Sequence, residues 1–217
     1  MDQQEFLRRI APITVGALST NCYVVRDSDK CIVVDPGAHG DKIAGAIAGE
    51  GLTCTIIVCT HGHHDHVGGV AALKRATGAT YMISEGDAER ATRAIELSSH
   101  VFDVNSPDIA NAPEADVRLK EGDVVSLGDI TLRVIEAPGH TEGGIVLVED
   151  DANVAFVGDT VFEGSVGRTD LVGGDAATLK KTIARLKEEL APECVLLTGH
   201  GNPTTMGREL MVNPFFL

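Results

Sequence analysis

Thr60-His61-Gly62-His63-His64-Asp65-His66 is the stretch that decides the fold, because it holds four of the chain's eight histidines. The preceding residues 55–59 are short, apolar and mostly β-branched, which predicts a buried strand. After the cluster, Val67, Val70 and Leu73 recur at helical spacing. We therefore expect the histidines to lie on a turn between a strand and a helix.

The spacing of these side chains predicts metal ligands. Residues two apart in an extended chain face the same side, so His61 and His63 can point at one ion. Asp65 and His66 are adjacent and should diverge as the helix begins, which suggests a second ion close to the first. The alternative is a solvated turn that happens to be rich in histidine. Imidazole and carboxylate at this density favour the metal site.

Composition limits the partners and the compartment. The chain has 217 residues, 43% of them hydrophobic, and a formal net charge of −14. Such an acidic chain lacks the basic surface that nucleic acids and anionic membranes need, so we expect neither partner. Its five cysteines form no Cys-x-x-Cys pair and favour a reducing cytosol, with Cys59 a small core residue.

Targeting signals are not evident in the sequence. Residues 1–9 lack the apolar segment of a signal peptide, and no run approaches the roughly 20 apolar residues of a membrane span. We therefore expect a soluble, cytoplasmic protein.

The first half of the chain predicts a β-meander followed by alternating helices and strands. Strands are expected at residues 13–18, 22–25, 31–34 and 80–83, and helices at 41–50 and 87–97, the latter with Ala88, Ala91 and Ile95 on its buried face. Asp35, in a turn after the third strand, is either a turn-former or a carboxylate that orients a metal-bound imidazole. His39 is interpreted as a surface residue.

Residues 98–114 have no period and predict a long loop. Loops of this length are often functional lids, so its His100 and Phe102 are candidates for substrate contact, with a plain surface loop as the alternative.

The second half predicts another run of strands and one capped helix. Strands are expected at residues 117–119, 124–127, 130–135, 145–148, 154–157 and 194–197. Asp175 is the expected N-cap of a helix with the apolar stripe Leu179, Ile183, Leu186 and Leu190. Two runs of strands with interleaved helices predict two sheets with helices packed outside, in a layered α/β protein. With no repeat or linker, residues 1–217 are expected to form one domain.

Histidine or aspartate recurs where a buried strand meets a glycine-rich loop. His140, Asp159 and His200 each follow such a strand, as His61 does. Alone, each has an ordinary interpretation: a capped loop histidine, a turn-former and a surface residue. Their common placement at strand ends favours a shared metal site.

This order and spacing of residues resembles the metallo-β-lactamase superfamily. The resemblance implies a four-layer αββα sandwich with the metals at one edge of the paired sheets. It also implies that Asp159 bridges two ions and that Asp35 lies behind the ligands; Asp65 is in addition the candidate catalytic residue. By the family pattern the first ion is held by His61, His63 and His140, and the second by Asp65, His66 and His200.

Within the superfamily the chain is most similar to the glyoxalase II-like (hydroxyacylglutathione hydrolase-like) short bacterial branch. Residues 158–162, 164–170 and 199–205, together with 213–215, carry this likeness. Full-length glyoxalase II has an additional C-terminal helical domain that helps to grip glutathione, and this sequence ends without one. Arg168 stands where that pattern places a lysine that contacts glutathione, which makes Arg168 the candidate substrate-binding residue. Its alternative is a structural pair with Asp170.

The resemblance implies a metal-dependent thioesterase that acts through a metal-bridging hydroxide on a small-molecule thioester, which is glutathione-linked in the nearest branch. The cofactors are two divalent metal ions; zinc is our prediction, and the absence of cysteine from the ligand set leaves iron and manganese open. The same site suits a lactone or phosphoester. A mononuclear iron persulfide dioxygenase is the alternative enzyme, since those relatives carry a segment like residues 167–170. A metal-binding protein without catalysis is a third class.

Overall fold

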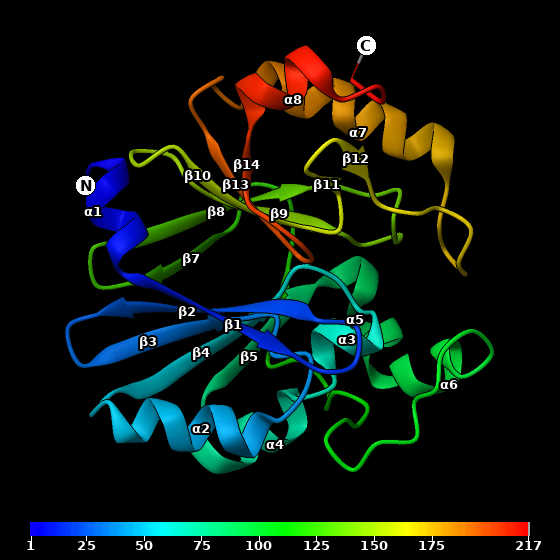
Figure 1. The fold of residues 1–217 in the computed structure, drawn as a ribbon. Helices are drawn as coiled ribbons and strands as arrows, with labels where there is room; N and C mark the ends of the chain where they lie inside the picture. The colour runs from blue at the N-terminus through cyan, green and yellow to red at the C-terminus, as the bar shows by residue number, and fades with distance from the viewer. Residues whose placement is uncertain (217) are drawn as a thin grey trace.

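The computed structural model describes residues 1–216, in which two six-stranded sheets pack face to face (Figure 1). The first sheet has the order β1 (Ile10–Val15), β2 (Thr20–Asp27), β3 (Lys30–Val34), β4 (Thr53–Cys59), β5 (Thr80–Ser84) and β6 (Val117–Leu119). The second has the order β14 (Thr204–Thr205), β13 (Val195–Thr198), β10 (Val154–Gly158), β9 (Ile145–Glu149), β8 (Ile130–Glu136) and β7 (Val124–Leu127). A small hairpin pairs β11 (Val161–Phe162) with β12 (Ser165–Val166).

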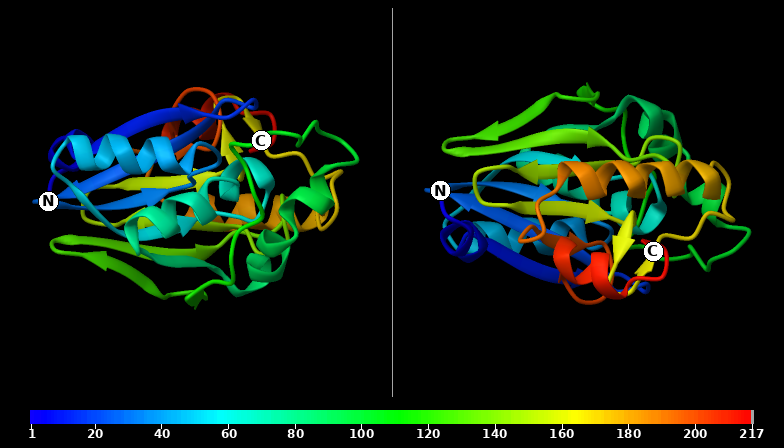
Figure 2. Two further views of the ribbon diagram at one scale, coloured as in Figure 1. Left: turned by 90° about the horizontal axis from the view of Figure 1, so that it is seen from below. Right: turned by 90° about the horizontal axis from the view of Figure 1, so that it is seen from above.

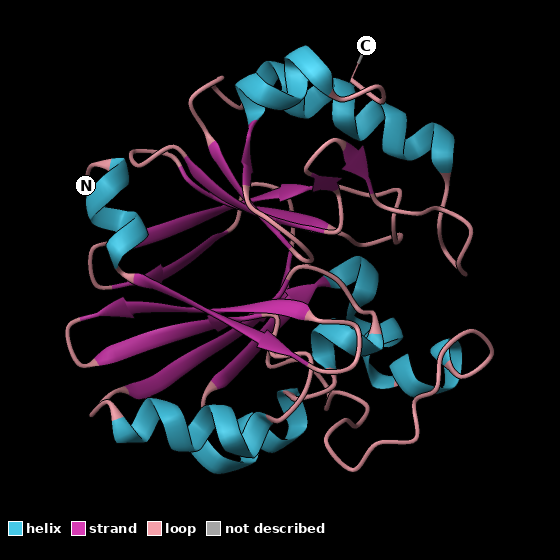
Figure 3. Ribbon diagram, viewed as in Figure 1, coloured by secondary structure: helices cyan, strands magenta, loops and turns pink. Residues whose placement is uncertain are grey.

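Helices cover the outer face of each sheet (Figures 2 and 3). Below the first sheet lie α2 (Gly40–Gly49) and α4 (Val70–Thr77), and above the second lie α7 (Ala176–Glu189) and α8 (Met206–Val212). The remaining helices are α1 (Gln3–Arg8), α3 (His64–Val67), α5 (Glu85–Thr92) and α6 (Ala94–Ser98). The predicted four-layer αββα sandwich is therefore confirmed.

Alternation along the strands builds the layers. In β3, Cys31 and Val33 face the helices on one side, whereas Ile32 and Val34 face the other sheet. All four side chains are completely buried. Because successive strand residues point to opposite faces, a continuously apolar strand can serve two cores at once.

The helix α7 packs on the outer face of the second sheet, and a separate hydrophobic core lies between them. Its apolar stripe, Leu179, Ile183 and Leu186, is buried with residues of β8, β9 and β10. The predicted N-cap is confirmed, because the Asp175 carboxylate accepts a hydrogen bond from the Thr178 backbone N–H at 2.6 Å.

The predicted meander is confirmed, because β1, β2 and β3 pair antiparallel in sequence. The first strand was placed too late, however: β1 ends at Val15 and not at Leu18. Gly16 follows it with a φ of 69°, which ends the extended conformation and starts the turn to β2.

The helix predicted at residues 87–97 is wrong in two respects. It begins at Glu85, and it is two helices, α5 and α6, that meet at Arg93, where φ is −127°. The Asn111 side chain accepts a hydrogen bond from the Ile95 backbone N–H at 2.8 Å in the first turn of α6. A side chain from the following loop thus supports the start of α6. In this turn Ala94 is buried, whereas Ile95, which was predicted to lie on the buried face, is half-buried.

Residues 99–114 are an irregular loop, as predicted, but it is tied to the body of the domain. Ala110 donates its backbone N–H to the carbonyl of Gly68, and His39 donates its own to the carbonyl of Asp108. The His39 ring also lies 3.0 Å from a carboxylate oxygen of Asp108. His39, predicted to be a surface residue, is therefore a half-buried anchor of this loop.

All five cysteines are buried free thiols, in agreement with the expected absence of a disulfide framework. Cys59 is completely buried, as predicted. None of the helices in residues 1–216 has both the length and the apolar character that crossing a bilayer requires.

Candidate metal centre

Four strand ends carry the candidate ligands to one edge of the sandwich. His61 follows β4, His140 follows β8, Asp159 follows β10 and His200 follows β13. The two sheets are joined at this edge, because the backbone N–H of Asn21 bonds the carbonyl of Gly199 at 2.7 Å. The structure thus brings all seven predicted side chains together: His61, His63, Asp65, His66, His140, Asp159 and His200.

The first group consists of three imidazoles that converge on one point. Nδ1 of His63 lies 3.1 Å from Nε2 of His61 and 2.9 Å from Nε2 of His140. Tetrahedral zinc with bonds of about 2.0–2.1 Å would separate ligand nitrogens by about 3.3 Å, close to this spacing. Nδ1 of His140 is 2.7 Å from the Arg168 carbonyl, which orients Nε2 toward the other two rings.

The second group is formed by Asp65, His66 and His200. Oδ2 of Asp65 lies 3.1 Å from Nε2 of His200 and 3.6 Å from Nε2 of His66. The two ring nitrogens are 3.4 Å apart. Nδ1 of His200 is held at 3.1 Å from the carbonyl of Leu18, so that Nε2 faces the group.

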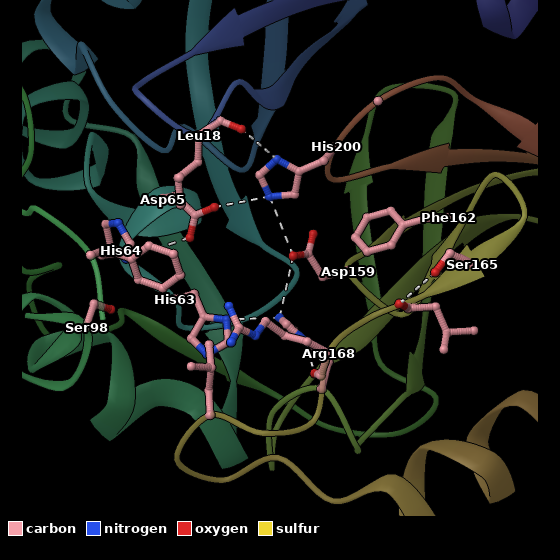
Figure 4. A pocket seen from close by; sticks show the side chains of 15 residues that line it. Leu18, His63, His64, Asp65, Ser98, Asp159, Phe162, Ser165, Arg168 and His200 are labelled. Carbon is pink, nitrogen blue, oxygen red and sulfur yellow. Dashed lines mark hydrogen bonds and ion pairs between the residues drawn. The ribbon is translucent and has the colours of Figure 1, made fainter. Parts of the chain in front are cut away.

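Asp159 lies between the two groups. Its Oδ1 is 3.3 Å from Nε2 of His66. Its Oδ2 is 3.5 Å from Nε2 of both His140 and His200, and Figure 4 shows Asp159 below the His200 ring. Oδ1 is buried without a hydrogen-bond partner among residues 1–216. A carboxylate placed in this way, with a free buried oxygen, fits a shared ligand of two ions. Asp159 can lie this close to His66 because residue 199 is a glycine. A Cβ at Gly199 would collide with the Asp159 carboxylate and the His66 ring.

Electrostatics differ between the two groups. Burial and the neighbouring imidazoles lower the pKa of His61 well below its ordinary value and that of His63 to about 3. At His66 and His200 burial acts in the same direction, but nearby carboxylates overcome it and raise the pKa of each ring.

The two carboxylates show the reciprocal effect. Burial opposes their ionisation, yet the imidazoles beside them, His66 above all, hold the pKa of Asp65 and of Asp159 below the usual value. The second group, with an ionised Asp65 and the raised pKa values of His66 and His200, therefore carries more charged side chains than the first group, in which the pKa values of His61 and His63 are lowered.

Asp35 is buried behind the second group. Its carboxylate accepts the backbone N–H and the hydroxyl of Thr60, each at 2.7 Å, and lies 2.9 Å from Nδ1 of His66. The carboxylate thus orients the His66 ring and holds the turn after β4. The turn that Asp35 itself occupies is a different one, after β3, where its φ is 51°.

Two residues of the site were not predicted from the sequence. Thr20 is completely buried, and its hydroxyl is 3.2 Å from Oδ2 of Asp65. Asp87 accepts the backbone N–H groups of Gly62 and Gly143, which ties the histidine cluster to the loop that carries His140. A threonine in a strand and an aspartate in a helix carry no local signal of such contacts, because their partners are distant in the sequence.

A cavity of about 540 Å³ opens in front of the two groups, and we call it the tail cavity. Phe162, Val166 and Leu171 give it apolar walls, and Arg168 lies at its edge. Of the two loop residues predicted to face a substrate, Phe102 lines this cavity, whereas His100 is exposed and does not. The Arg168 guanidinium makes two hydrogen bonds of 2.7 Å to Asp170, so the predicted alternative pair is present.

The chain is similar to known proteins along most of its length. A family model described as the Metallo-beta-lactamase superfamily matches residues 15–200. The chain is 32% identical to the hydroxyacylglutathione hydrolase GloC of Haemophilus influenzae, over 94% of this chain and 95% of that protein.

Two solved structures are similar along almost the whole chain. One is the BLEG-1 B3 metallo-beta-lactamase, with a TM-score of 0.86 and 31% identity over 95% of this chain and 99% of that one. The other is TTHA1623 in a di-iron-bound form, with a TM-score of 0.83 and 32% identity over 94% of this chain and 99% of that one.

Proposed function

Because the chain belongs to the metallo-beta-lactamase superfamily, we propose that it is a dinuclear metal-dependent thioester hydrolase of the hydroxyacylglutathione hydrolase type. The position of Asp159 between two groups of ligands carries the dinuclear part of this proposal. The GloC relative supports the thioester part. Zinc is the proposed metal. Iron is the alternative to be tested, because the similar protein TTHA1623 has been solved in a di-iron-bound form.

Each residue has a defined task in this mechanism. His61, His63 and His140 would hold one ion, and Asp65, His66 and His200 the other, with Asp159 shared. Two bound divalent ions would lower the pKa of water and polarise the thioester carbonyl. The carboxylates of Asp65 and Asp159 offset only part of the positive charge of such ions, so the filled site stays cationic and favours an oxyanion.

Thr20 and Asp35 would support these tasks through the candidate ligands that they contact, Asp65 and His66. The Thr20 hydroxyl lies against Oδ2 of Asp65 and fixes the direction of that carboxylate, which is also the candidate catalytic group. Asp35 fixes the orientation of the His66 ring. Arg168, which lines the tail cavity, would bind the anionic part of the carrier thiol through its guanidinium.

Metal analysis paired with a substrate panel tests the proposal. The protein loaded separately with zinc, iron or manganese should hydrolyse S-lactoylglutathione and release a thiol, and Asp159→Ala should abolish this activity. Asp151, an exposed aspartate outside the site, gives a matched control in Asp151→Ala. If the protein held a single iron and consumed oxygen in the presence of a persulfide, the proposal of a hydrolase would be rejected in favour of a persulfide dioxygenase. Turnover confined to a β-lactam, lactone or phosphoester would keep the metal centre and reject the thioester.

A further inference from the structure

A further cavity borders the segment that carries Arg168. It has a volume of about 500 Å³ and lies between residues 166–169, the N-terminal part of α7 and residues 214–215. We call it the distal cavity. It shares Val166 and Arg168 with the tail cavity. The two cavities therefore adjoin along the segment 166–168, and a ligand that starts at the metal centre and passes Arg168 can reach the distal cavity.

The walls of the distal cavity are largely apolar. Leu179 and Ile183 of α7 line it, and so does Phe215, which is 57% exposed. The end of the chain is held beside α7, because Lys187 donates a hydrogen bond of 2.6 Å to the carbonyl of Phe216 (Figure 1). An exposed aromatic ring fixed beside apolar walls offers a face on which a planar group can stack.

The charge of the distal cavity is opposite to that of the whole protein. The chain has 32 acidic residues against 18 basic ones, yet the residues of 1–216 that line this cavity include Arg168 and Lys180 and no aspartate or glutamate. Lys180 is exposed on α7. Asp170, the present partner of Arg168, lies outside the lining. Two cations beside apolar walls favour a ligand that carries both negative charge and a planar or apolar group.

Glutathione does not match this combination. Its glycine carboxylate is isolated, but its other carboxylate lies next to its own ammonium group, so the single guanidinium of Arg168 suits it. A carrier that continues past Arg168 to Lys180 needs further anionic groups and a group that packs on Phe215. Phosphates pair with lysine and arginine, and nucleobases stack on aromatic rings. A pantetheine thiol that ends in an adenine nucleotide has both features at the end opposite its sulfur.

We propose that the distal cavity binds the nucleotide end of such a carrier, with the phosphates at Lys180 and Arg168 and the base against Phe215. The pantetheine arm lies along the tail cavity, and the thioester carbonyl lies at the metal centre. This inference rests on the proposed function and adds coenzyme A thioesters to its substrates.

Two matched thioesters measure the contribution of the nucleotide. S-lactoylcoenzyme A and S-lactoylpantetheine share the acyl group and the thiol arm, and only the former has the nucleotide. We expect the parent protein to have a KM about ten- to a hundredfold lower for the coenzyme A thioester, with similar kcat, because the nucleotide is remote from the reacting carbonyl. Lys180→Ala should remove about tenfold of this preference, the value of one charge-assisted hydrogen bond. Equal KM values in the parent would overturn the inference.

Lys181→Ala is the matched control, because Lys181 is also an exposed lysine of α7 but is not among the described residues that line the distal cavity. It should keep the preference of the parent. Phe215→Ala should weaken the preference, whereas Met211→Ala should not, since Met211 is exposed and also outside the described lining. Equal effects of Lys180→Ala and Lys181→Ala would overturn the assignment to the distal cavity, because only the general charge of α7 would then matter.

Binding without turnover separates this inference from the proposed function. S-methylcoenzyme A and S-methylglutathione have neither a free thiol nor an acyl group, so calorimetry with these two compounds measures the affinity for each carrier directly. Tighter binding of S-methylcoenzyme A that Lys180→Ala weakens, without hydrolysis of any thioester, would support the distal cavity and overturn the proposed function. Thioester hydrolysis without a preference for either coenzyme A compound would overturn this inference and leave the proposed function in place.

Discussion

Nδ1 of His66 lies 2.9 Å from Oδ2 of Asp35, so that Nε2 of the same ring faces Asp65 and His200. Asp35→Asn replaces the anionic acceptor of the His66 Nδ1–H with a neutral amide. Because an amide can both donate and accept, it no longer fixes the orientation of the imidazole. We expect the second ion to bind about ten- to a hundredfold more weakly, as is typical when the partner of a ligating histidine is lost. Titration of the ion-free protein with zinc, followed by calorimetry, measures this change.

Asp87→Asn is the matched control, because Asp87 is also a buried aspartate that accepts backbone N–H groups but contacts no candidate ligand ring. Since Asp87 joins the loops of His63 and His140, this variant should weaken the first site instead. Equal losses at both sites in both variants would show that the aspartates act only through overall stability.

Asp159 should be the one carboxylate whose loss disturbs both ions. Its two oxygens lie within 3.5 Å of His66, His140 and His200, which belong to different groups. The parent should bind about two ions per chain, the usual content of a hydrolase with paired ligand groups. Asp159→Ala should lower the affinity of both, whereas His200→Ala should remove only one.

Elemental analysis after metal loading and desalting gives the stoichiometry of each variant. A parent protein with one ion, whose content does not change in His200→Ala, would contradict two sites. Retention of both ions by Asp159→Ala would contradict the shared ligand.

The limits of sequence reasoning are visible at the same site. His61, His140 and Asp159 follow buried strands, and strand ends meet at a sheet edge, so their convergence was predictable from local patterns. The contacts of Thr20 and Asp87 were not, because they depend on how the two sheets and α5 pack. Several short elements were missed for a related reason: α1 has six residues, α8 seven, and β11, β12 and β14 two each, too few for a period to be recognised.

Acidification should release the second ion before the first. An imidazole must lose its proton to bind a metal, so a raised pKa means that protons compete up to a higher pH. The pKa values of His66 and His200 are raised, whereas that of His61 is lowered and that of His63 lies at about 3. Affinity at the second site should fall by about tenfold per pH unit for each protonated ring, with little proton competition from His61 and His63.

Metal content after dialysis at stepwise lower pH, from about pH 8 to about pH 5, shows the order of release. The protein should pass through a form with one ion per chain. Simultaneous loss of both ions, or first release from the group of His61, would contradict the electrostatic difference between the sites.

Arg168 and Asp170 form an exposed ion pair at the edge of the tail cavity, with side chains 46% and 67% exposed. Such surface pairs contribute little to stability, so the guanidinium can exchange its partner for an anionic substrate tail. Arg168→Ala should raise KM for S-lactoylglutathione by about ten- to a hundredfold with little change in kcat, because the tail is bound equally in the ground and transition states. Asp170→Asn should have the opposite effect and lower KM, since it frees the guanidinium and removes a negative charge. Steady-state kinetics of both variants, on this thioester and on an uncharged thioester of N-acetylcysteamine, separate binding from structure. If the two variants raised KM alike on both substrates, the pair would serve only to hold the loop.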